Sequence, residues 1–204
     1  MEQTQRNIQE GKKEYLDELI ELLKIPSISA DSSYDNDTKR CAEWVKSAMD
    51  SVGLQNAKIY ETAGHPVVFG EFIKKDSLPT VLIYGHYDVQ PPDPLELWTS
   101  PPFEPVVKNE KIYARGAADD KGQFYMYFAA IKSMIQANEV PCNIKVLIEG
   151  EEEVGSENLE TFVLNNKDLL SNDVILISDT HMISNDHPSI TAGLKGLAYM
   201  EVEV

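Results

Sequence analysis

The sequence has 204 residues, enough for one domain with a substantial core or for one domain and the beginning of another. Its apolar fraction of 42% and charged fraction of 25% are those of an ordinary globular chain and argue against wholesale disorder. The 34 acidic and 18 basic residues give a net charge of -16, which argues against a nucleic-acid partner because phosphate backbones are bound by clustered Lys and Arg.

Two amphipathic helices are expected in the first quarter of the chain. Apolar residues recur at steps of mostly three and four over residues 8–24, and Pro26 ends that helix. Residues 25–37 are rich in Ser, Asp and Asn and are expected to form a loop. The second helix is expected from about Asp37 to Val52, with Gly53 at its end.

Short β-rich segments alternate with helices in the rest of the chain. Strands are expected at residues 58–61, 67–73, 81–84, 111–114, 143–148 and 173–177, and helices at residues 121–136 and 156–165. The strands at 81–84, 143–148 and 173–177 are apolar enough to be covered on both faces. The Pro-rich segment Pro91–Pro105 is expected to form a long irregular loop. This alternation predicts an α/β fold with a largely parallel central sheet flanked by helices.

From Ala192 onward the character of the sequence changes. Gly193 and Gly196 bracket two residues, and Leu197–Val204 then alternates between the two sides of a strand. The chain stops within this predicted strand without a turn signal, so we expect a truncation at that point.

Nothing in the sequence predicts a membrane protein or a secreted one. No stretch is long and apolar enough to cross a bilayer, and the N-terminus lacks the basic-then-apolar pattern of a secretion signal. The two cysteines, Cys41 and Cys142, lie far apart and outside any Cys-x-x-Cys spacing. We therefore expect free structural cysteines and a cytoplasmic location.

A histidine and an aspartate follow the first of the predicted buried strands. Open α/β sheets bind ligands at the carboxyl ends of their strands, so polar residues there are candidates for a functional site. His86 and Asp88 are two residues apart in extended chain and therefore point to the same side. A carboxylate commonly holds the second ring nitrogen of a metal-binding His. Taken alone, however, the pair fits a surface or core histidine better.

Two adjacent aspartates, Asp119 and Asp120, lie between a predicted strand and a predicted helix. Acidic groups favour the N-terminus of a helix, so both residues fit the role of simple helix caps. Their small neighbours also leave room for one of them to bridge two cations.

Four glutamates occur within five positions after the predicted strand at residues 143–148. They are Glu149, Glu151, Glu152 and Glu153. A helix N-terminus accounts for one or two of them, but four repel one another, and divalent metal ions would relieve that repulsion. Asp179 stands at the end of the last predicted buried strand. With His86, these carboxylates form a nitrogen and oxygen ligand set without thiolates, which suits Zn²⁺, Mn²⁺ or Co²⁺ in a catalytic site.

The succession of these motifs resembles the M20 family of metallopeptidases. The motifs are GHYDVQP at residues 85–91, Trp98 with PFEP at 102–105, ARGAADDKG at 114–122 and EGEEEVGS at 149–156. They span almost the whole chain in the family's order. The resemblance implies a zinc-exopeptidase-like catalytic domain with two divalent metal ions. Zn²⁺ is the leading candidate for these ions, and Mn²⁺ or Co²⁺ are the alternatives.

The resemblance implies a metal-binding role for four residues. His86, Asp119 and Asp179 would hold one ion, and Asp119 would bridge to a second ion held by Glu153. The peptide bond between Asp119 and Asp120 would be cis, as is common in the family.

Two further residues would act in catalysis. Glu152 would be the general base that takes a proton from a water shared by the two ions. Asp88 would orient His86. Because adjacent residues point in different directions, Glu153 can bind a metal ion while Glu152 acts on the water.

Members of the family are longer than this chain and carry a lid domain inserted into the catalytic domain. The resemblance therefore assigns residues 1–187 to the N-terminal part of the catalytic domain and residues 188–204 to the beginning of a truncated lid. The second metal ion's His would come from a C-terminal part, and we interpret His65, His181 and His187 as loop histidines. The chain alone is expected to be inactive, and the full-length protein is expected to form a homodimer through the lid.

The implied function is the cleavage of amide bonds in dipeptides or small peptides. DDKG at residues 119–122 and VQP at 89–91 are more similar to the dipeptidase branch of the family than to its deacylase branches. An N-acyl-amino-acid amidohydrolase that uses the same metals is the alternative, and a non-catalytic metal-binding fragment is a further one. The motifs of phosphate-loop enzymes and serine hydrolases are absent from the sequence.

Overall fold

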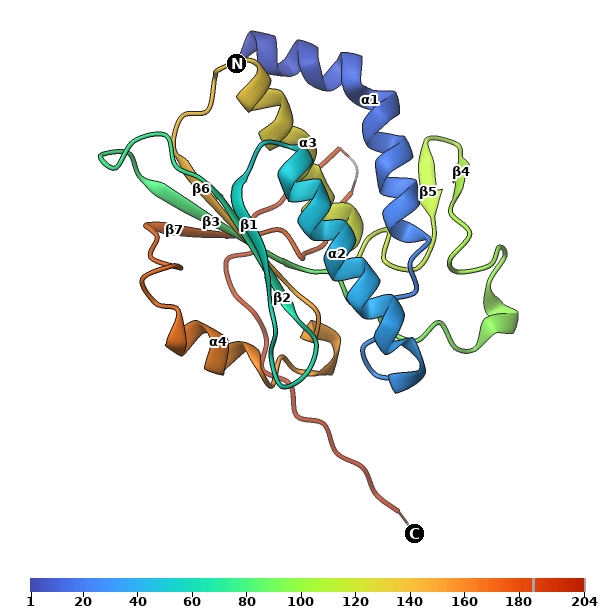
Figure 1. Ribbon diagram of the computed structural model, residues 1–204. Helices are drawn as coiled ribbons and strands as arrows, with labels where there is room; N and C mark the ends of the chain where they lie inside the picture. Colours follow the sequence, from blue (N-terminus) through green and yellow to red (C-terminus); the bar gives the residue numbers. More distant parts are fainter. Residues whose placement is uncertain (185, 204) are drawn as a thin grey trace.

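The computed structural model describes residues 1–184 and 186–203 (Figure 1). Its helices are α1 (Glu2–Leu23), α2 (Asp35–Ser51), α3 (Lys121–Gln136) and α4 (Leu159–Asn165), and its short 3₁₀ turns are η1 (Ser32–Tyr34), η2 (Leu95–Leu97) and η3 (Glu152–Val154). Its strands are β1 (Gln55–Tyr60), β2 (Val67–Phe72), β3 (Thr80–His86), β4 (Val106–Lys108), β5 (Lys111–Tyr113), β6 (Asn143–Glu149) and β7 (Val174–Ile177). Apart from the short β4, each of these helices and strands corresponds to a segment predicted from the sequence.

Five strands form one mixed sheet in the order β1-β2-β6-β3-β7. β6, β3 and β7 are parallel, whereas β2 pairs antiparallel with both β1 and β6. The α/β class is therefore confirmed, and the parallel part of the sheet consists of three strands. β4 and β5 form a separate two-stranded antiparallel sheet within the segment between β3 and α3.

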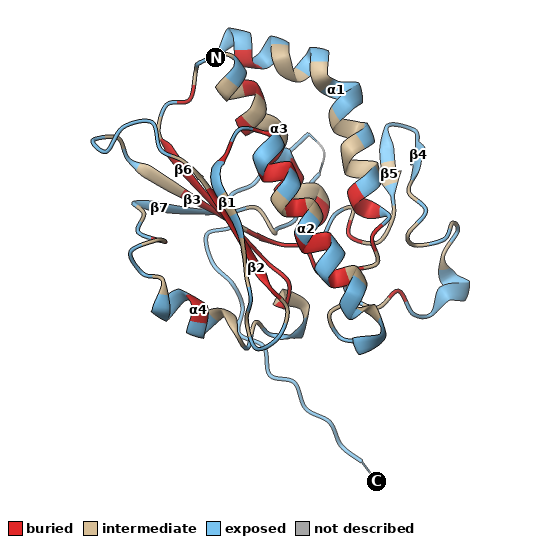
Figure 2. Cartoon of the chain, in the orientation of Figure 1, coloured by how far each residue is buried: buried red, intermediate tan, exposed pale blue. Residues whose placement is uncertain are grey.

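Helices cover both faces of the sheet, as the alternation of side chains along β6 shows. Val146 and Ile148 point into a cluster with residues of α2 and α3, whereas Leu147 between them packs with Phe162 of α4 on the opposite face. On the face of the sheet that α2 and α3 cover, α1 packs against α3 (Figure 1). Buried residues are concentrated where the sheet meets α2 and α3 (Figure 2).

α1 begins at Glu2, six residues before the predicted start at residue 8. Its first turn is polar, so the apolar periodicity does not reach it. A tertiary contact holds this turn instead: the backbone N–H and the hydroxyl of Thr4 both donate to Oε2 of Glu139, at 3.0 and 2.6 Å. The contact involves a residue 135 positions away, which local pattern does not reveal.

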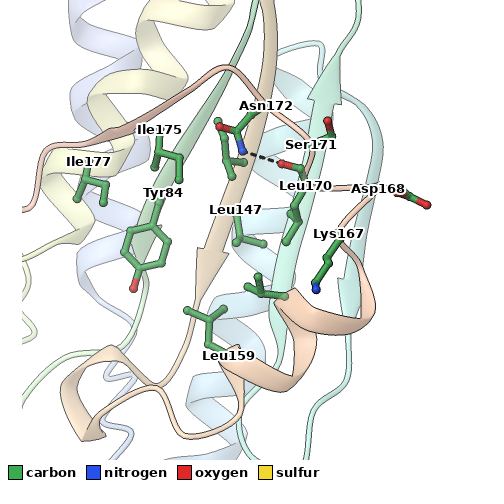
Figure 3. Close-up of a pocket in the computed structure, with 12 residues that line it drawn as sticks. Tyr84, Leu147, Leu159, Lys167, Asp168, Leu170, Ser171, Asn172, Ile175 and Ile177 are labelled. Atoms are coloured by element: carbon green, nitrogen blue, oxygen red, sulfur yellow. Dashed lines mark hydrogen bonds between the residues drawn. The ribbon is translucent and has the colours of Figure 1, made fainter.

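The last strand of the sheet is exposed, which corrects the prediction of a buried strand at residues 173–177. The four side chains of β7 are 41% to 57% exposed. β7 lies at the edge of the sheet, and its neighbour in the described residues is β3. A groove of about 560 Å³ lies beside it, lined by residues that include Tyr84, Leu147 and Ile175 (Figure 3). The apolar character of a strand shows that it is suited to burial. It does not show whether another segment of the chain covers that strand.

The strand predicted at Leu197–Val204 is not formed by residues 197–203, and Val204 lies outside the described residues. Residues 188–203 contain no helix or strand and are exposed. A strand needs a partner for its N–H and C=O groups, and within residues 1–184 and 186–203 this segment has none in a sheet. The division of the chain between residues 187 and 188 stays a prediction.

Two smaller expectations concern the membrane and the cysteines. Among the described residues, no helix combines the length and the apolar character needed to span a bilayer. Cys41 and Cys142 are both free, as predicted.

Candidate metal centre

The carboxyl ends of the three parallel strands lie at one edge of the sheet. His86 is the last residue of β3 and is in register with Glu149, the last residue of β6. Tyr84 of β3 is in register with Ile177 of β7, which places Asp179 beyond that end of β7. Asp119 comes from a different element, the segment that enters α3. The fold therefore brings side chains from distant parts of the sequence to one place.

The ring of His86 is completely buried and is held by Asp88. Its Nδ1 lies 3.1 Å from the backbone carbonyl oxygen of Asp88 and 3.3 Å from Oδ1 of the same residue. A proton on Nδ1 therefore has an acceptor, which leaves Nε2 to face the other carboxylates. This is the orientation that a metal-binding imidazole requires.

Two carboxylates face Nε2 of His86. Oδ1 of Asp119 lies 3.0 Å from it and Oδ2 of Asp179 lies 3.5 Å from it. One ligand atom from each of the three residues fits within 4.8 Å of the other two. One imidazole nitrogen and two carboxylate oxygens are ligands of the kind that Zn²⁺ binds in catalytic sites. The donor set therefore fits a divalent metal ion.

Glu152 and Glu153 are adjacent but have different surroundings. Oε2 of Glu152 lies 3.8 Å from Nε2 of His86, beside the group of three ligands. Oε2 of Glu153 instead accepts a hydrogen bond of 2.7 Å from Nε2 of Gln90. The structure thus places Glu152 near the predicted first ion, and Glu153 outside the three-residue group.

The carboxylate of Asp88 ties these elements together. It is completely buried, and it accepts hydrogen bonds from the backbone N–H groups of Glu152 and Glu153 at 3.2 and 3.1 Å. The hydroxyl of Ser29 donates to Oδ2 of Asp88 at 2.6 Å. Asp88 therefore connects the ring of His86 with the start of η3.

Asp120 links the start of α3 to the end of β3. Its side chain is buried, and its Oδ2 accepts a hydrogen bond of 3.0 Å from the backbone N–H of His86. A Cβ added to Gly85 would come within 2.6 Å of this oxygen, so glycine permits the close approach of the two segments. The peptide bond between Asp119 and Asp120 is cis, as the family resemblance implied.

The pKa shifts within the cluster reflect an excess of negative charge around His86. Burial alone lowers the pKa of His86, but the hydrogen bond with Asp88 and the charges of Asp120 and Glu152 outweigh it and raise the pKa to about 10. Burial also raises the pKa of Glu152, and the neighbouring Glu153 and Asp179 carboxylates add to the effect. A divalent cation would supply the positive charge that these groups favour.

The remaining histidines are separate from the three-residue group. His65 lies in the segment between β1 and β2, and its Nε2 is 3.3 Å from the carbonyl oxygen of Ser29. Nδ1 of His187 is 2.8 Å from the hydroxyl of Ser184. His181 and His187 are both exposed. All three lie outside helices and strands, as predicted.

Two residues near the centre received no role from the sequence. Ser29 lies in a segment interpreted only as a loop. Gln90 belongs to the motif GHYDVQP, in which only His86 and Asp88 were given individual roles. Gln90 could have been found from its place in that motif, next to the His86 and Asp88 pair. No local signal marks Ser29, because its partner Asp88 lies 59 positions away in the sequence.

Comparison with known proteins gives consistent matches. A family model described as peptidase family M20/M25/M40 matches residues 82–193, which is more than half of the chain. The Cys-Gly metallodipeptidase dug1 of Schizosaccharomyces pombe is 32% identical over 210 residues, covering 97% of this chain and 44% of that protein. The Beta-Ala-His dipeptidase of Homo sapiens is 39% identical over 142 residues, covering 68% of this chain and 28% of that protein.

Solved structures with the same fold also match most of this chain and less than half of their own chains. A metallo-carboxypeptidase of the M20 family from Sulfolobus solfataricus matches with a TM-score of 0.78 and 39% identity, covering 85% of this chain and 39% of that one. Human carnosine dipeptidase 1 matches with a TM-score of 0.81 and 29% identity, covering 90% of this chain and 42% of that one. The chain thus spans less than half of the length of these relatives.

Proposed function

The chain belongs to peptidase family M20/M25/M40, and from this premise we propose that it carries the metal centre of a hydrolase that cleaves dipeptides or other small peptides. Two relatives, named for Cys-Gly and for Beta-Ala-His, support a dipeptide as the substrate. The observation that carries the proposal is the convergence of His86, Asp119 and Asp179, whose ligand atoms lie within 4.8 Å of one another.

The centre would hold two divalent ions, with zinc as the first candidate. His86, Asp119 and Asp179 would bind one ion, and Asp119 would share the second ion with Glu153. The negative charge of Asp119 contributes to the raised pKa of Glu153, after the larger effect of burial, which supports placing a cation between the two carboxylates. When bound, such ions supply a water of lowered pKa and polarise the carbonyl group of the scissile amide bond.

Glu152 would act as the general base. Its side chain is 38% exposed and lies 3.8 Å from Nε2 of His86, so it is close to the centre and accessible to a substrate. Burial holds the pKa of its carboxyl above the usual range, which favours a group that alternately accepts and releases a proton. Glu152 would take a proton from the attacking water at its carboxylate and donate it to the leaving amine.

Asp88 would fix the tautomer and the orientation of His86. Its carbonyl and carboxylate oxygens both face Nδ1, and its carboxylate also binds two backbone N–H groups of η3. This arrangement would keep Nε2 directed at the metal while holding Glu152 and Glu153 at a constant distance from it.

The test compares metal content with turnover. Release of free amino acids from Cys-Gly and from β-Ala-His would be measured with added Zn²⁺ or Mn²⁺. The assay would use this chain alone, and also this chain co-expressed with the part of the S. pombe relative that lies outside the matched region. We expect Glu152→Ala to abolish turnover while the metal content stays near that of the unmodified chain. The exposed Glu157→Ala provides the matched control and should change neither.

Other outcomes would identify the alternatives. Loss of metal together with turnover in Glu152→Ala would make Glu152 a ligand and contradict its role as the base. Cleavage of N-acyl-amino acids without cleavage of dipeptides would favour the amidohydrolase. Metal binding without turnover in either form would favour a non-catalytic metal-binding role. Location in the cytoplasm and dimerisation through a lid stay predictions.

A further inference from the structure

We infer that Ser29 is a positioning residue of the metal centre, which acts by completing the hydrogen bonds of the Asp88 carboxylate. The inference rests on the proposed function, because it concerns the same centre. It assigns a role to the segment Ile25–Ser29, which contributes none of the proposed ligands or catalytic groups.

The four contacts of the Asp88 carboxylate are divided evenly between its two oxygens. Oδ1 accepts from the backbone N–H of Glu152 and faces Nδ1 of His86, at 3.2 and 3.3 Å. Oδ2 accepts from the backbone N–H of Glu153 and from the hydroxyl of Ser29, at 3.1 and 2.6 Å. An ionised carboxylate offers about four lone-pair positions, so these four partners occupy its full capacity. Ser29 supplies the shortest of the four contacts.

The backbone that leads to Ser29 is held in place, because its segment is bonded to the residues that follow β3. Ile28 forms a parallel bridge with Val89, and the backbone N–H of Val89 donates to the carbonyl of Ser27 at 2.9 Å. The hydroxyl of Ser27 donates to the carbonyl of Tyr87 at 2.6 Å. The segment therefore runs alongside the residues that flank Asp88.

The other end of the segment is anchored to the start of α3. Nζ of Lys121, a completely buried side chain, donates to the carbonyl oxygen of Ile25 at 2.6 Å. Lys121 comes two positions after Asp119, a proposed ligand. The segment Ile25–Ser29 thus joins the part of the chain that carries Asp119 to the carboxylate that holds His86.

Removing the hydroxyl of Ser29 would leave one position of the buried Asp88 carboxylate without a donor. The side chain of Asp88 is completely buried, and an unsatisfied buried acceptor is costly, so Asp88 would shift toward another donor. Because Asp88 also contacts His86 and the N–H groups of η3, a shift would misalign Nε2 relative to Asp119 and Asp179. Loss of a hydrogen bond behind a metal ligand typically lowers metal affinity by about 10–100-fold.

The experiment measures Zn²⁺ affinity by competition with a chromophoric chelator, and records the visible absorption of the Co²⁺-substituted chain as a report on ligand geometry. We expect Ser29→Ala to weaken Zn²⁺ binding by about 10–100-fold and to shift the Co²⁺ bands. Ser29→Thr retains the hydroxyl and should restore most of the affinity. Should Ser29→Ala fail to fold, Ser29→Cys, which has only a weak donor, takes its place with the same expected direction.

Ser133→Ala is the matched control. Ser29 is partly buried and Ser133 is completely buried. The hydroxyl of Ser133 lies 2.9 Å from the hydroxyl of Tyr15, between α1 and α3 and away from the centre. We expect this variant to lower the melting temperature without changing Zn²⁺ affinity or the Co²⁺ spectrum. In an Asp88→Asn background, Ser29→Ala should have little further effect on affinity, because the two residues act through one contact.

Two results would overturn the inference. One is a Ser29→Ala chain that binds Zn²⁺ as tightly as the unmodified chain, with the same Co²⁺ spectrum. The other is an equal loss of affinity in Ser29→Ala and Ser133→Ala, which would reveal a general effect of stability. Failure of the proposed function has a different signature: the unmodified chain would bind Zn²⁺ without cleaving peptides, and the comparison of Ser29→Ala with Ser133→Ala would still decide the role of Ser29.

Discussion

β3 and β7 are neighbouring parallel strands that lead to the same group of ligands, but they differ in burial. Leu82 and Ile83 of β3 are 5% and 4% exposed, whereas the side chains of β7 are 41% to 57% exposed. β3 is bonded on both sides, to β6 and β7, and β7 has β3 as its partner in the described residues. The position of His86 is therefore determined by packing, whereas that of Asp179 depends on strand pairing.

The comparison teaches that the candidate metal centre has a rigid side and an adaptable side. On the rigid side, His86 and Asp88 are completely buried, and Asp120 bonds to the backbone of β3. On the adaptable side, Asp179 follows an exposed strand that borders the groove of Figure 3. Substitutions on the two sides should therefore have unequal effects.

The largest difference is expected in metal affinity. His86→Ala removes the one nitrogen ligand of the proposed set, which is completely buried, and it should weaken Zn²⁺ binding by more than about 1000-fold, which corresponds to about 4 kcal/mol. Asp179→Ala removes a ligand that is accessible to water, and the loss should be closer to about tenfold. Chelator competition measures both values, with circular dichroism to establish that each variant is folded. A greater loss in Asp179→Ala would reverse the assignment of rigid and adaptable sides.

A smaller difference is expected in the stability of the metal-free chain. Ile83→Ala deletes a buried side chain of β3 and should lower the free energy of unfolding by about 2–5 kcal/mol. Ile175→Ala makes the same change on β7, where the side chain is 57% exposed, and should lower it by less than about 1 kcal/mol. Urea denaturation gives both free energies. Similar values for the two variants would contradict the difference in burial.

The smallest effect is the pH dependence of metal binding, which depends on the proton of His86 on the rigid side. Because the carboxylates around His86 raise its pKa to about 10, the imidazole of the metal-free chain carries a proton below that pH. A metal ion must displace this proton, so the apparent affinity should fall as the pH is lowered, with about one proton released per ion bound at pH 7 to 8. Calorimetry in two buffers of different ionisation enthalpy measures the number. Binding without proton release would show that Nε2 of His86 is not a ligand.

Much of the fold was predictable because the relevant patterns are local. α3 has the predicted bounds, Lys121–Gln136, and α2, β3 and β6 differ from their predictions by a few residues at most. Long apolar runs and helical periodicity are encoded within each segment. Burial of β7 was predicted wrongly, because burial also depends on the segments that cover a strand.

The candidate site was predictable to a similar extent and for a related reason. Parallel strands end at one edge, so the polar residues that follow the predicted strands, His86, Glu152 and Asp179, are expected to be neighbours, and Nε2 of His86 lies 3.8 Å from Glu152 and 3.5 Å from Asp179. The role of Ser29 was not predictable, because it depends on a contact between segments that are 59 residues apart.

The most direct test of the central claim is anomalous diffraction at the zinc edge from crystals of the chain grown with Zn²⁺. The account predicts a peak among Nε2 of His86 and the carboxylate oxygens of Asp119 and Asp179, and its absence from crystals of His86→Ala. Zinc bound only elsewhere on the chain, or a peak at this place that persists in His86→Ala, would contradict it.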